Sequence, residues 1–368
     1  MQETRPPQQP MILRQRKLNV GATSRCVTCI TMSCTPHQVN WVLYGVSDTT
    51  VASDPLWSVV MYDMDTSDTI VVDKGRCVGG CAPQSMSISY DNILSVAMGS
   101  QGVRLYAVAP RLGDKSGYAT ALHTFRHGYA SFAEFVWNSA SERALVTRSG
   151  DAKGVDRIML HGRLREETAS SIELMNTPTD TITSLSAASP GNVAVLVASE
   201  NVLHVLMATR GGATFKRQSL NLLQFAASRG SAGYMLPVNA VIGTTHVVIG
   251  YSSLSTTGNG MVEVINLTDN TMTSRRTLLG ANPMALACHG PRVLVGGDSR
   301  HDECRRMFLF SATEEENYAL AQNDDSPWAQ ESTVLRGTGY CFAARERSPS
   351  GEVQSVIHWG VVALSTQP

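Results

Sequence analysis

Short runs of apolar residues recur along the chain, and turns rich in glycine, asparagine, aspartate or serine separate them. Seven of these runs lie at intervals of about 50 residues, at positions 42–46, 93–98, 144–147, 193–198, 246–249, 293–295 and 341–344. A second apolar run follows each of them, at 59–62, 103–106, 158–160, 203–206, 262–265, 308–310 and 355–358. The runs are short and lack the helical period of 3.6 residues, so they predict β-strands.

Most units also contain a strand of small residues about ten positions upstream of the first apolar run, such as Met86-Ser87-Ile88. Each unit thus contains a strand of small residues, two apolar strands and a more polar segment, in that order. This order indicates a four-stranded antiparallel sheet. A ring of such sheets protects their edges by radial repetition. The sequence therefore predicts an all-β fold, a seven-bladed β-propeller in a single domain over residues 11–368. Residues 1–10 are predicted to be a disordered tail.

The residues at the ends of the second apolar runs can be compared with the repeat motif of a known family. The positions that would hold Trp-Asp in a WD repeat are Tyr62-Asp63, Tyr106-Ala107, Leu160-His161, Leu206-Met207, Ile265-Asn266, Phe310-Ser311 and His358-Trp359. The pattern resembles a divergent WD-repeat propeller, in which the bulky half of the pair packs between neighbouring sheets while most of the aspartates have been lost. The resemblance implies the architecture, of which this chain would be a divergent member, and it implies no catalytic residue.

Propeller rings commonly close by pairing an N-terminal strand with the last sheet. Residues 11–18 form a plausible closing strand because they lie outside the first unit and an outer strand tolerates polar positions. Residues 361–364 are the alternative, since they could complete the last sheet from the C-terminal side. A two-domain β protein is a further alternative, which would arise if the irregular turn at 149–155 in the third unit did not pair in register.

Composition narrows the function without naming a partner. The chain has 43% hydrophobic and 17% charged residues, so it has enough apolar residues to form a buried core. Its formal net charge is -1, so the protein as a whole does not attract nucleic acid or anionic lipid electrostatically. No apolar run approaches the length of a membrane-spanning helix, so no membrane insertion is expected. The N-terminus lacks an apolar signal region, which predicts an intracellular protein of the cytoplasm or nucleus. Pro6, Pro7 and Pro10 argue against a mitochondrial import helix.

One cluster has the composition of a zinc site. Cys26, Cys29, Cys34 and His37 lie within twelve residues and offer the sulfur and nitrogen donors that tetrahedral zinc prefers. The segment occupies the inner-strand position of the first unit, however, where Cys26 and Cys29 would point to opposite faces. We therefore predict buried thiols, with no metal and no cofactor, and keep zinc as the alternative.

Catalytic motifs are missing from the sequence. No phosphate-binding glycine loop and no nucleophile elbow occurs, and the nine histidines are scattered. The inner strands offer Met, Ser, Ala, Thr and Cys, so the expectation is a protein that is not an enzyme. Two alternatives remain: an enzyme or ligand binder that uses the central channel, and an RNA-binding propeller. The basic clusters that an RNA-binding face would use are Arg163 with Arg165, and Arg300, His301, Arg305 and Arg306.

The leading hypothesis is a non-catalytic protein–protein interaction scaffold within a larger eukaryotic assembly, of the nuclear-pore or coat, ciliary or RNA-processing type. Recognition usually resides in loops on a rigid scaffold, and the longest excursion covers residues 314–330. There Trp328 and Tyr318 lie among acidic residues, in the pattern of an interface hot spot. Asp54 and Trp57, in the loop of the first unit, are the second predicted partner contact.

Overall fold

The computed structural model describes residues 12–362 except for short gaps. The gaps are residues 23, 36–37, 52, 65, 110–117, 127, 139–142, 152, 163–170, 179–180, 189–190, 209–214, 223–234, 254–259, 279–281, 291, 299–306, 312–316 and 320–327. The predicted tail at 1–10 lies outside the described residues, as do the basic clusters that an RNA-binding face would use.

The described strands form seven four-stranded antiparallel sheets, which we number in chain order. Sheet 1 contains β2 (Arg25–Thr35), β3 (Gln38–Asp48), β4 (Leu56–Asp63) and β5 (Thr69–Arg76), and sheet 2 contains β6 (Ser85–Ile88), β7 (Ile93–Ala97), β8 (Val103–Ala109) and β9 (Tyr118–Phe125). Sheet 3 contains β10 (Tyr129–Asn138), β11 (Arg143–Gly150), β12 (Val155–Gly162) and β13 (Ser171–Pro178), and sheet 4 contains β14 (Ser184–Ala188), β15 (Asn192–Val197), β16 (Val202–Ala208) and β17 (Phe215–Asn221), with the short 3-10 helix η1 (Ala198–Glu200) between β15 and β16.

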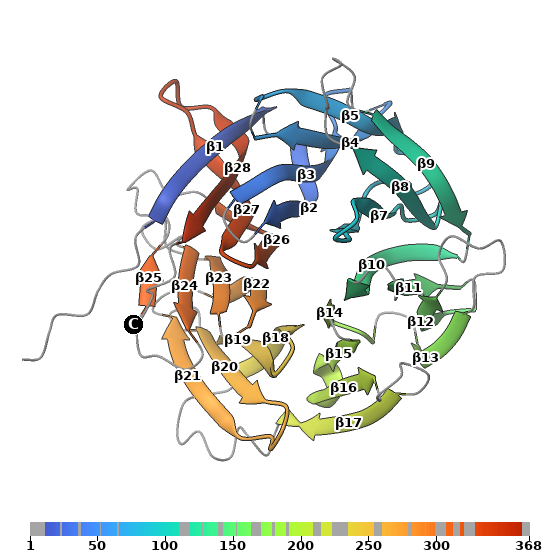
Figure 1. The fold of residues 1–368 in the computed structure, drawn as a ribbon, viewed down its shortest axis with the longest axis vertical. Coiled ribbons are helices and arrows are strands. Elements are labelled where there is room, and N and C mark those ends of the chain that lie inside the picture. The colour runs from blue at the N-terminus through green and yellow to red at the C-terminus, as the bar shows by residue number, and fades with distance from the viewer. Residues whose placement is uncertain are drawn as a thin grey trace, which may run out of the picture.

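The remaining sheets repeat this plan. Sheet 5 contains β18 (Met235–Ile242), β19 (His246–Ser253), β20 (Gly260–Asn266) and β21 (Met272–Leu278), and sheet 6 contains β22 (Asn282–His289), β23 (Arg292–Asp298), β24 (Met307–Ser311) and β25 (Asn317–Ala319). Sheet 7 contains β26 (Trp328–Arg336), β27 (Gly339–Arg347) and β28 (Val353–Val362), and its outer strand is β1 (Ile12–Ala22). The sheets stand in a ring with the first strand of each unit nearest the centre (Figure 1), which confirms the predicted all-β propeller.

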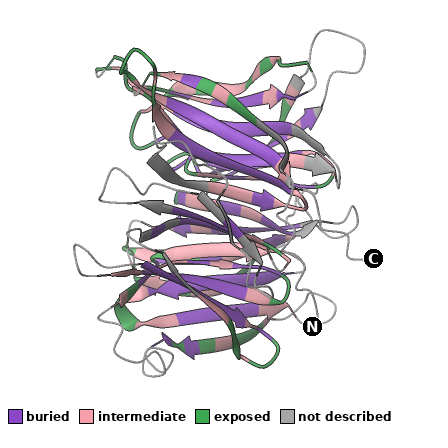
Figure 2. Ribbon diagram, turned by 90° about the vertical axis from the view of Figure 1, so that its left-hand side faces the viewer, coloured by how far each residue is buried: buried purple, intermediate pink, exposed green. Residues whose placement is uncertain are grey.

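Burial follows the position of a strand within its sheet. The second strands β7 and β15 are buried at every residue, because both of their faces pack against neighbouring sheets. The outer strands β5 and β13 alternate between exposed and half-buried residues, since they lie at the circumference. Figure 2 shows the same distribution from the side, with buried residues along the strands and exposed ones gathered mainly at the turns.

The N-terminal strand closes the ring, as predicted. β1 pairs antiparallel with β28 from Ile12 opposite Val362 to Ala22 opposite Gln354. Val20, which is 7% exposed, packs with Ile30 and Tyr44 of sheet 1, so the closing strand also contributes to the core between the first and last sheets. Residues 361 and 362 belong to β28, the third strand of its sheet, and do not form the outer strand.

Two aromatic residues pack against each other at the junction between sheets 1 and 7. The rings of Tyr62 and Trp359 lie 5.5 Å apart between centroids, one at the end of β4 and the other in β28. Tyr62 comes from the Trp position of its pair and Trp359 from the Asp position, and at this junction both pack between the two sheets.

The strands on either side of the turn at 149–155 pair in register. β11 and β12 pair without a register shift up to Gly150 opposite Asp156. The Asp151 side chain accepts hydrogen bonds from the backbone N–H groups of Lys153, at 2.8 Å, and Val155, at 3.1 Å, which holds the turn. The irregularity that motivated the two-domain alternative is therefore absent from these two strands. Among the described residues, no helix has the length and apolar character needed to cross a membrane.

Candidate functional sites: a central channel and a rim surface

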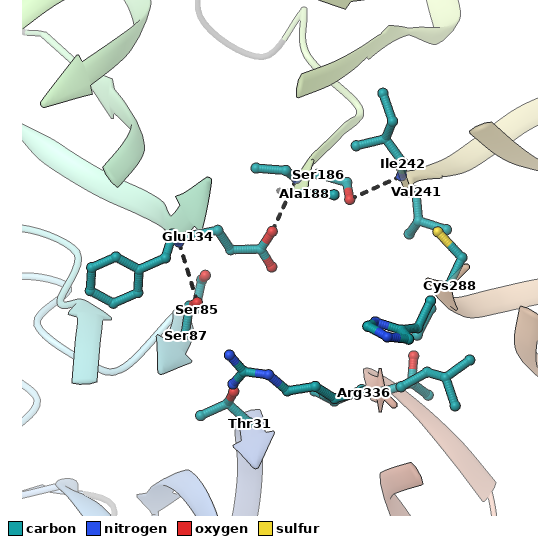
Figure 3. Close-up of a pocket in the computed structure, with 18 of the residues that line it drawn as sticks. Thr31, Ser85, Ser87, Glu134, Ser186, Ala188, Val241, Ile242, Cys288 and Arg336 are labelled. Carbon is teal, nitrogen blue, oxygen red and sulfur yellow. Dashed lines mark hydrogen bonds between the residues drawn. The ribbon is translucent and has the colours of Figure 1, made fainter. Parts of the chain in front are cut away.

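The seven inner strands enclose a central channel with a cavity of about 620 Å³. Every sheet contributes lining residues, because the first strand of each faces the axis of the ring. The small side chains that the sequence places on these strands leave the space open. The channel lining is drawn in Figure 3.

Hydroxyl groups of these strands hold neighbouring sheets together. Ser85 and Ser87 of β6 accept hydrogen bonds from the backbone N–H groups of Ala133 and Phe135 of β10, each at 3.3 Å. In the same way, the backbone N–H groups of Ala240 and Ile242 of β18 donate to Ser184 and Ser186 of β14, each at 3.2 Å. The matched two-residue steps show that adjacent inner strands run parallel, so their carboxyl ends meet at one mouth of the channel.

Glu134 makes the corresponding contact between sheets 3 and 4. Its Oε2 accepts the backbone N–H of Ala187 at 3.0 Å, and its carboxyl group points into the channel (Figure 3). Desolvation raises the pKa of Glu134 to about 7, and the hydrogen bond from Ala187 opposes this rise. Across the channel, burial raises the pKa of Cys288 to about 12, and the charge of Glu134 adds to that effect.

One mouth of the channel carries the cationic side chain of Arg336. Arg336, at the end of β26, donates to the carbonyl oxygens of Met32, at 3.2 Å, and Ile88, at 2.8 Å, and its guanidinium lies 5.1 Å from the centroid of the Tyr90 ring. It thereby joins sheets 7, 1 and 2. Burial lowers the pKa of His289 at the end of β22, and the charges of Arg336 and Arg292 lower it further.

Two channel residues were missed by the sequence analysis. It expected Met, Ser, Ala, Thr and Cys on the inner strands, whereas the structure adds Glu134 and Arg336. A signal existed for Glu134, because it is a charged residue within the apolar segment Phe132 to Val136, at the inner-strand position of the third unit. The expected set of inner-strand side chains therefore lacked one acidic and one basic residue.

A second surface lies on the rim, where loops of sheets 1, 2 and 3 meet. We call it the rim patch and define it by four exposed apolar side chains and an ion pair: Val51 (56% exposed), Leu56 (48%), Val78 (70%), Tyr129 (44%) and the pair Asp54–Arg76. The Asp54 Oδ2 and Arg76 Nε atoms lie 3.4 Å apart. Exposed apolar residues that gather in this way mark interaction surfaces.

Backbone contacts hold the loops of the rim patch together. Cys77 donates its N–H to the carbonyl of Pro55 at 2.7 Å, which ties the loop after β3 to the loop after β5. Gly99 and Ala130 exchange backbone hydrogen bonds, both at 2.9 Å, which ties sheet 2 to sheet 3. Gly99 has φ +56 and its Cα hydrogen faces the carbonyl of Gly80, where a Cβ would come within 2.1 Å, so the site accepts only glycine.

The four residues that the sequence analysis predicted as partner contacts lie in different parts of the structure. Asp54 lies in the rim patch. Trp57 is only 3% exposed, and its Nε1 donates to the carbonyl of Arg76 at 3.1 Å, so its ring is part of the core rather than a surface anchor. Tyr318 and Trp328 were expected in a loop, but Tyr318 lies in the outer strand β25 and Trp328 begins the inner strand β26, opposite Arg345. For both, only the backbone is described.

The cysteines of the first unit point in different directions. Cys26 receives a hydrogen bond from Arg345 of β27 at 3.4 Å, while Cys29 packs with Cys81 and Met86 on the side of sheet 2. Burial raises the pKa of the Cys29 thiol to about 12. His37 and the side chain of Cys34 lie outside the described part. Within the described residues, no group of three or more His, Cys, Asp or Glu side chains is placed to hold a metal ion.

Comparison with known proteins agrees with this architecture. No family model matches the chain, and no curated protein matches it. Among solved structures, it is similar to Sqt1 from Chaetomium thermophilum, with 14% identity and a TM-score of 0.56 over 95% of this chain and 99% of that one. It is also similar to a chain of the mitotic checkpoint complex (12%, 0.56, over 93% of each) and to the β-propeller domain of Cps50 (Swd1) from Myceliophteria thermophila (13%, 0.53, over 93% and 99%).

The chain has a propeller fold. These neighbours are WD-type β-propellers, and at such low identities the similarity shows the fold alone. Another of the structures holds Sqt1 bound to the N-terminus of the ribosomal protein L10 (13% identity, TM-score 0.55, over 92% of this chain and 97% of that one).

Proposed function

We propose that this chain is a divergent, seven-bladed WD-repeat-type propeller that acts as a non-catalytic protein-interaction scaffold in a multiprotein assembly inside the cell. The observation that carries the proposal is the rim patch. Its four apolar side chains are between 44% and 70% exposed, and backbone hydrogen bonds from three sheets hold their loops in place. Loops that are already held by hydrogen bonds lose less conformational entropy when they bind a partner.

The composition of the rim patch resembles the centre of a protein interface. Tyrosine and aliphatic side chains supply the area that is removed from water, and the Asp54–Arg76 pair supplies polar groups at the edge. Binding of the L10 N-terminus by Sqt1 shows that a propeller similar to this one can hold a protein segment. Trp328 and Tyr318 remain proposed contacts on a separate part of the ring.

Affinity purification of the tagged chain from its own cells tests this proposal. We expect a stoichiometric protein partner, and we expect the double variant Val51→Ser/Val78→Ser to recover at least about tenfold less of it, because two exposed apolar contacts are lost. Both side chains are mostly exposed, so the melting temperature should stay within about 2 °C of the unaltered protein.

A matched control is available on the outer strands. Val71 of β5 (54% exposed) and Leu122 of β9 (47%) are exposed to a similar degree outside the rim patch, and Val71→Ser/Leu122→Ser should leave partner recovery unchanged. Recovery of the chain as a lone monomer would contradict the scaffold function. Equal partner recovery by the two double variants would instead contradict the rim patch as its docking surface.

A further inference from the structure

Glu134 occupies a position at which neighbouring sheets use serine. Between sheets 2 and 3, and between sheets 4 and 5, a serine hydroxyl accepts the backbone N–H of the next inner strand. Between sheets 3 and 4, Glu134 makes this contact with Ala187. A hydroxyl would satisfy that N–H equally well, so the structural contact does not require a carboxyl group.

A charge at this position is costly without a counter-ion. The carboxyl group points into the channel and none of the described basic side chains forms an ion pair with it. Desolvation raises the pKa of Glu134, and the hydrogen bond from Ala187 opposes this rise. An isolated carboxylate in such surroundings is stabilised by a cation that enters the channel.

The lining around Glu134 fits a planar, weakly hydrated cation. The hydroxyl oxygens of Thr31, Ser85, Ser87 and Ser186 line the same cavity of about 620 Å³, and each can accept a hydrogen bond from the ligand. A guanidinium group has five N–H donors and is less strongly hydrated than an ammonium, so it can pair with a carboxylate and still donate to hydroxyls. Its single positive charge is also opposite to the single negative charge of the ionised carboxylate.

We propose that the central channel binds a guanidinium group, with the Glu134 carboxylate as its counter-ion. The group belongs either to a free small molecule or to an arginine side chain of a bound protein segment. Because Arg336 places a positive charge at the mouth formed by the carboxyl ends of the inner strands, the ligand enters from the opposite mouth, near Gln84. This proposal does not depend on the rim patch or on the scaffold function.

Titration calorimetry on the purified full chain tests the site with an isosteric pair of probes. We expect propylguanidinium to bind at pH 8.0 and propylurea, which has nearly the same shape without the charge, to bind at least about tenfold more weakly. Binding should weaken roughly thirtyfold between pH 8.0 and pH 5.5, since a carboxyl group with a pKa of about 7 is mostly protonated at the lower pH.

The variant Glu134→Gln keeps an acceptor for Ala187 and removes the charge, so it should bind propylguanidinium at least about tenfold more weakly and lose the pH dependence. Glu173→Gln, on the outer strand β13, is the matched control and should bind as the unaltered protein does. If Glu134→Gln does not fold, the pH dependence of the unaltered protein still decides. Equal binding of propylguanidinium and propylurea, or binding that is independent of pH, would overturn the proposal.

Two peptides distinguish the sources of the guanidinium. Gly-Arg-Gly and its citrulline analogue differ only in that charge. Tighter binding of Gly-Arg-Gly than of propylguanidinium, with discrimination against the citrulline peptide, would support a protein segment as the ligand. Binding of propylguanidinium but not of Gly-Arg-Gly would support a free small molecule.

Discussion

At the scale of single residues, Trp57 and Glu134 differ in what their surroundings require of them. Trp57 satisfies every demand of its site: its ring fills space between sheets 1 and 2, its Nε1 donates to a carbonyl, and Arg104 lies 5.6 Å from its centroid. Glu134 does not, because its charge is desolvated. The first residue therefore serves stability and the second opposes it, and each can be tested.

Glu134 makes stability depend on pH. Its pKa rises from 4.5 in the unfolded chain to about 7 in the folded protein, so the folded state binds more protons between these values and stability falls as pH rises through them. The contribution is at most about 3 kcal/mol. Urea unfolding at pH 5 and pH 7.5 should show a smaller difference for Glu134→Gln than for the unaltered protein. An identical pH dependence in the two proteins would show that the carboxyl group is not desolvated.

Trp57→Ala should lower the free energy of unfolding by about 3–5 kcal/mol, because it leaves a cavity and removes one of the hydrogen bonds to the carbonyl of Arg76. Chemical denaturation measures this loss. The more conservative Trp57→Phe keeps most of the volume and should lose less. A tryptophan at the surface would give a change below about 0.5 kcal/mol, which would contradict its burial in the core.

At the scale of elements, the closing strand ties the two ends of the chain together. β1 covers β28, which would otherwise present a long unpaired edge, and Val20 adds to the core of the junction. Side chains reinforce the pairing: Lys17 of β1 forms an ion pair with Glu346 of β27, and Glu346 also bonds His358 of β28. Burial raises the pKa of Glu346, but the hydrogen bonds with His358 and Lys17 and the charges of these two residues outweigh that effect and lower it.

Removal of residues 1–24 should therefore lower the melting temperature by more than about 5 °C and promote aggregation through the uncovered edge of β28. Differential scanning fluorimetry and light scattering measure the two effects. Removal of residues 1–11 is the matched control: it keeps β1 and tests the predicted disordered tail, and it should leave the melting temperature unchanged. Equal melting temperatures for both truncations would show that β1 does not hold the ring closed.

The strands were largely predictable from sequence, because each apolar run is delimited by turn residues whose backbone conformation few others adopt. Asn92 (φ 62) and Asn201 (φ 53), for example, mark turns that end predicted strands. The ring closure by β1 was also predictable, since that segment lies outside the repeat. The strands around Tyr318 and Trp328 were not, because a polar sequence does not distinguish a strand at the end of a sheet from a loop.

At the scale of the whole molecule, function depends on which residues the ring brings together, and repeat spacing cannot show that. The rim patch joins residues of sheets 1 and 3 and of the loop between sheets 1 and 2, and Glu134 becomes unusual only when its neighbours around the channel are known to be serines. Trp57 shows the converse: its sequence context resembles that of Trp328, yet it is buried. Burial of an aromatic residue next to a loop is decided by packing between sheets, which the local sequence does not encode.

Trp328 is the remaining aromatic anchor, and it lies in sheet 7, whereas the rim patch spans sheets 1 to 3. If a partner contacts the ring there as well, Trp328→Ala should weaken its binding by roughly 2 kcal/mol while the melting temperature hardly changes, since a hot-spot tryptophan is used at the interface and not in the core. Quantitative co-purification and fluorimetry on the same variant measure both quantities, with Trp57→Ala as the example of a core tryptophan. A lowered melting temperature with unaltered recovery of the partner would place Trp328 in the packing of sheet 7, and the rim patch would then be the proposed docking surface by itself.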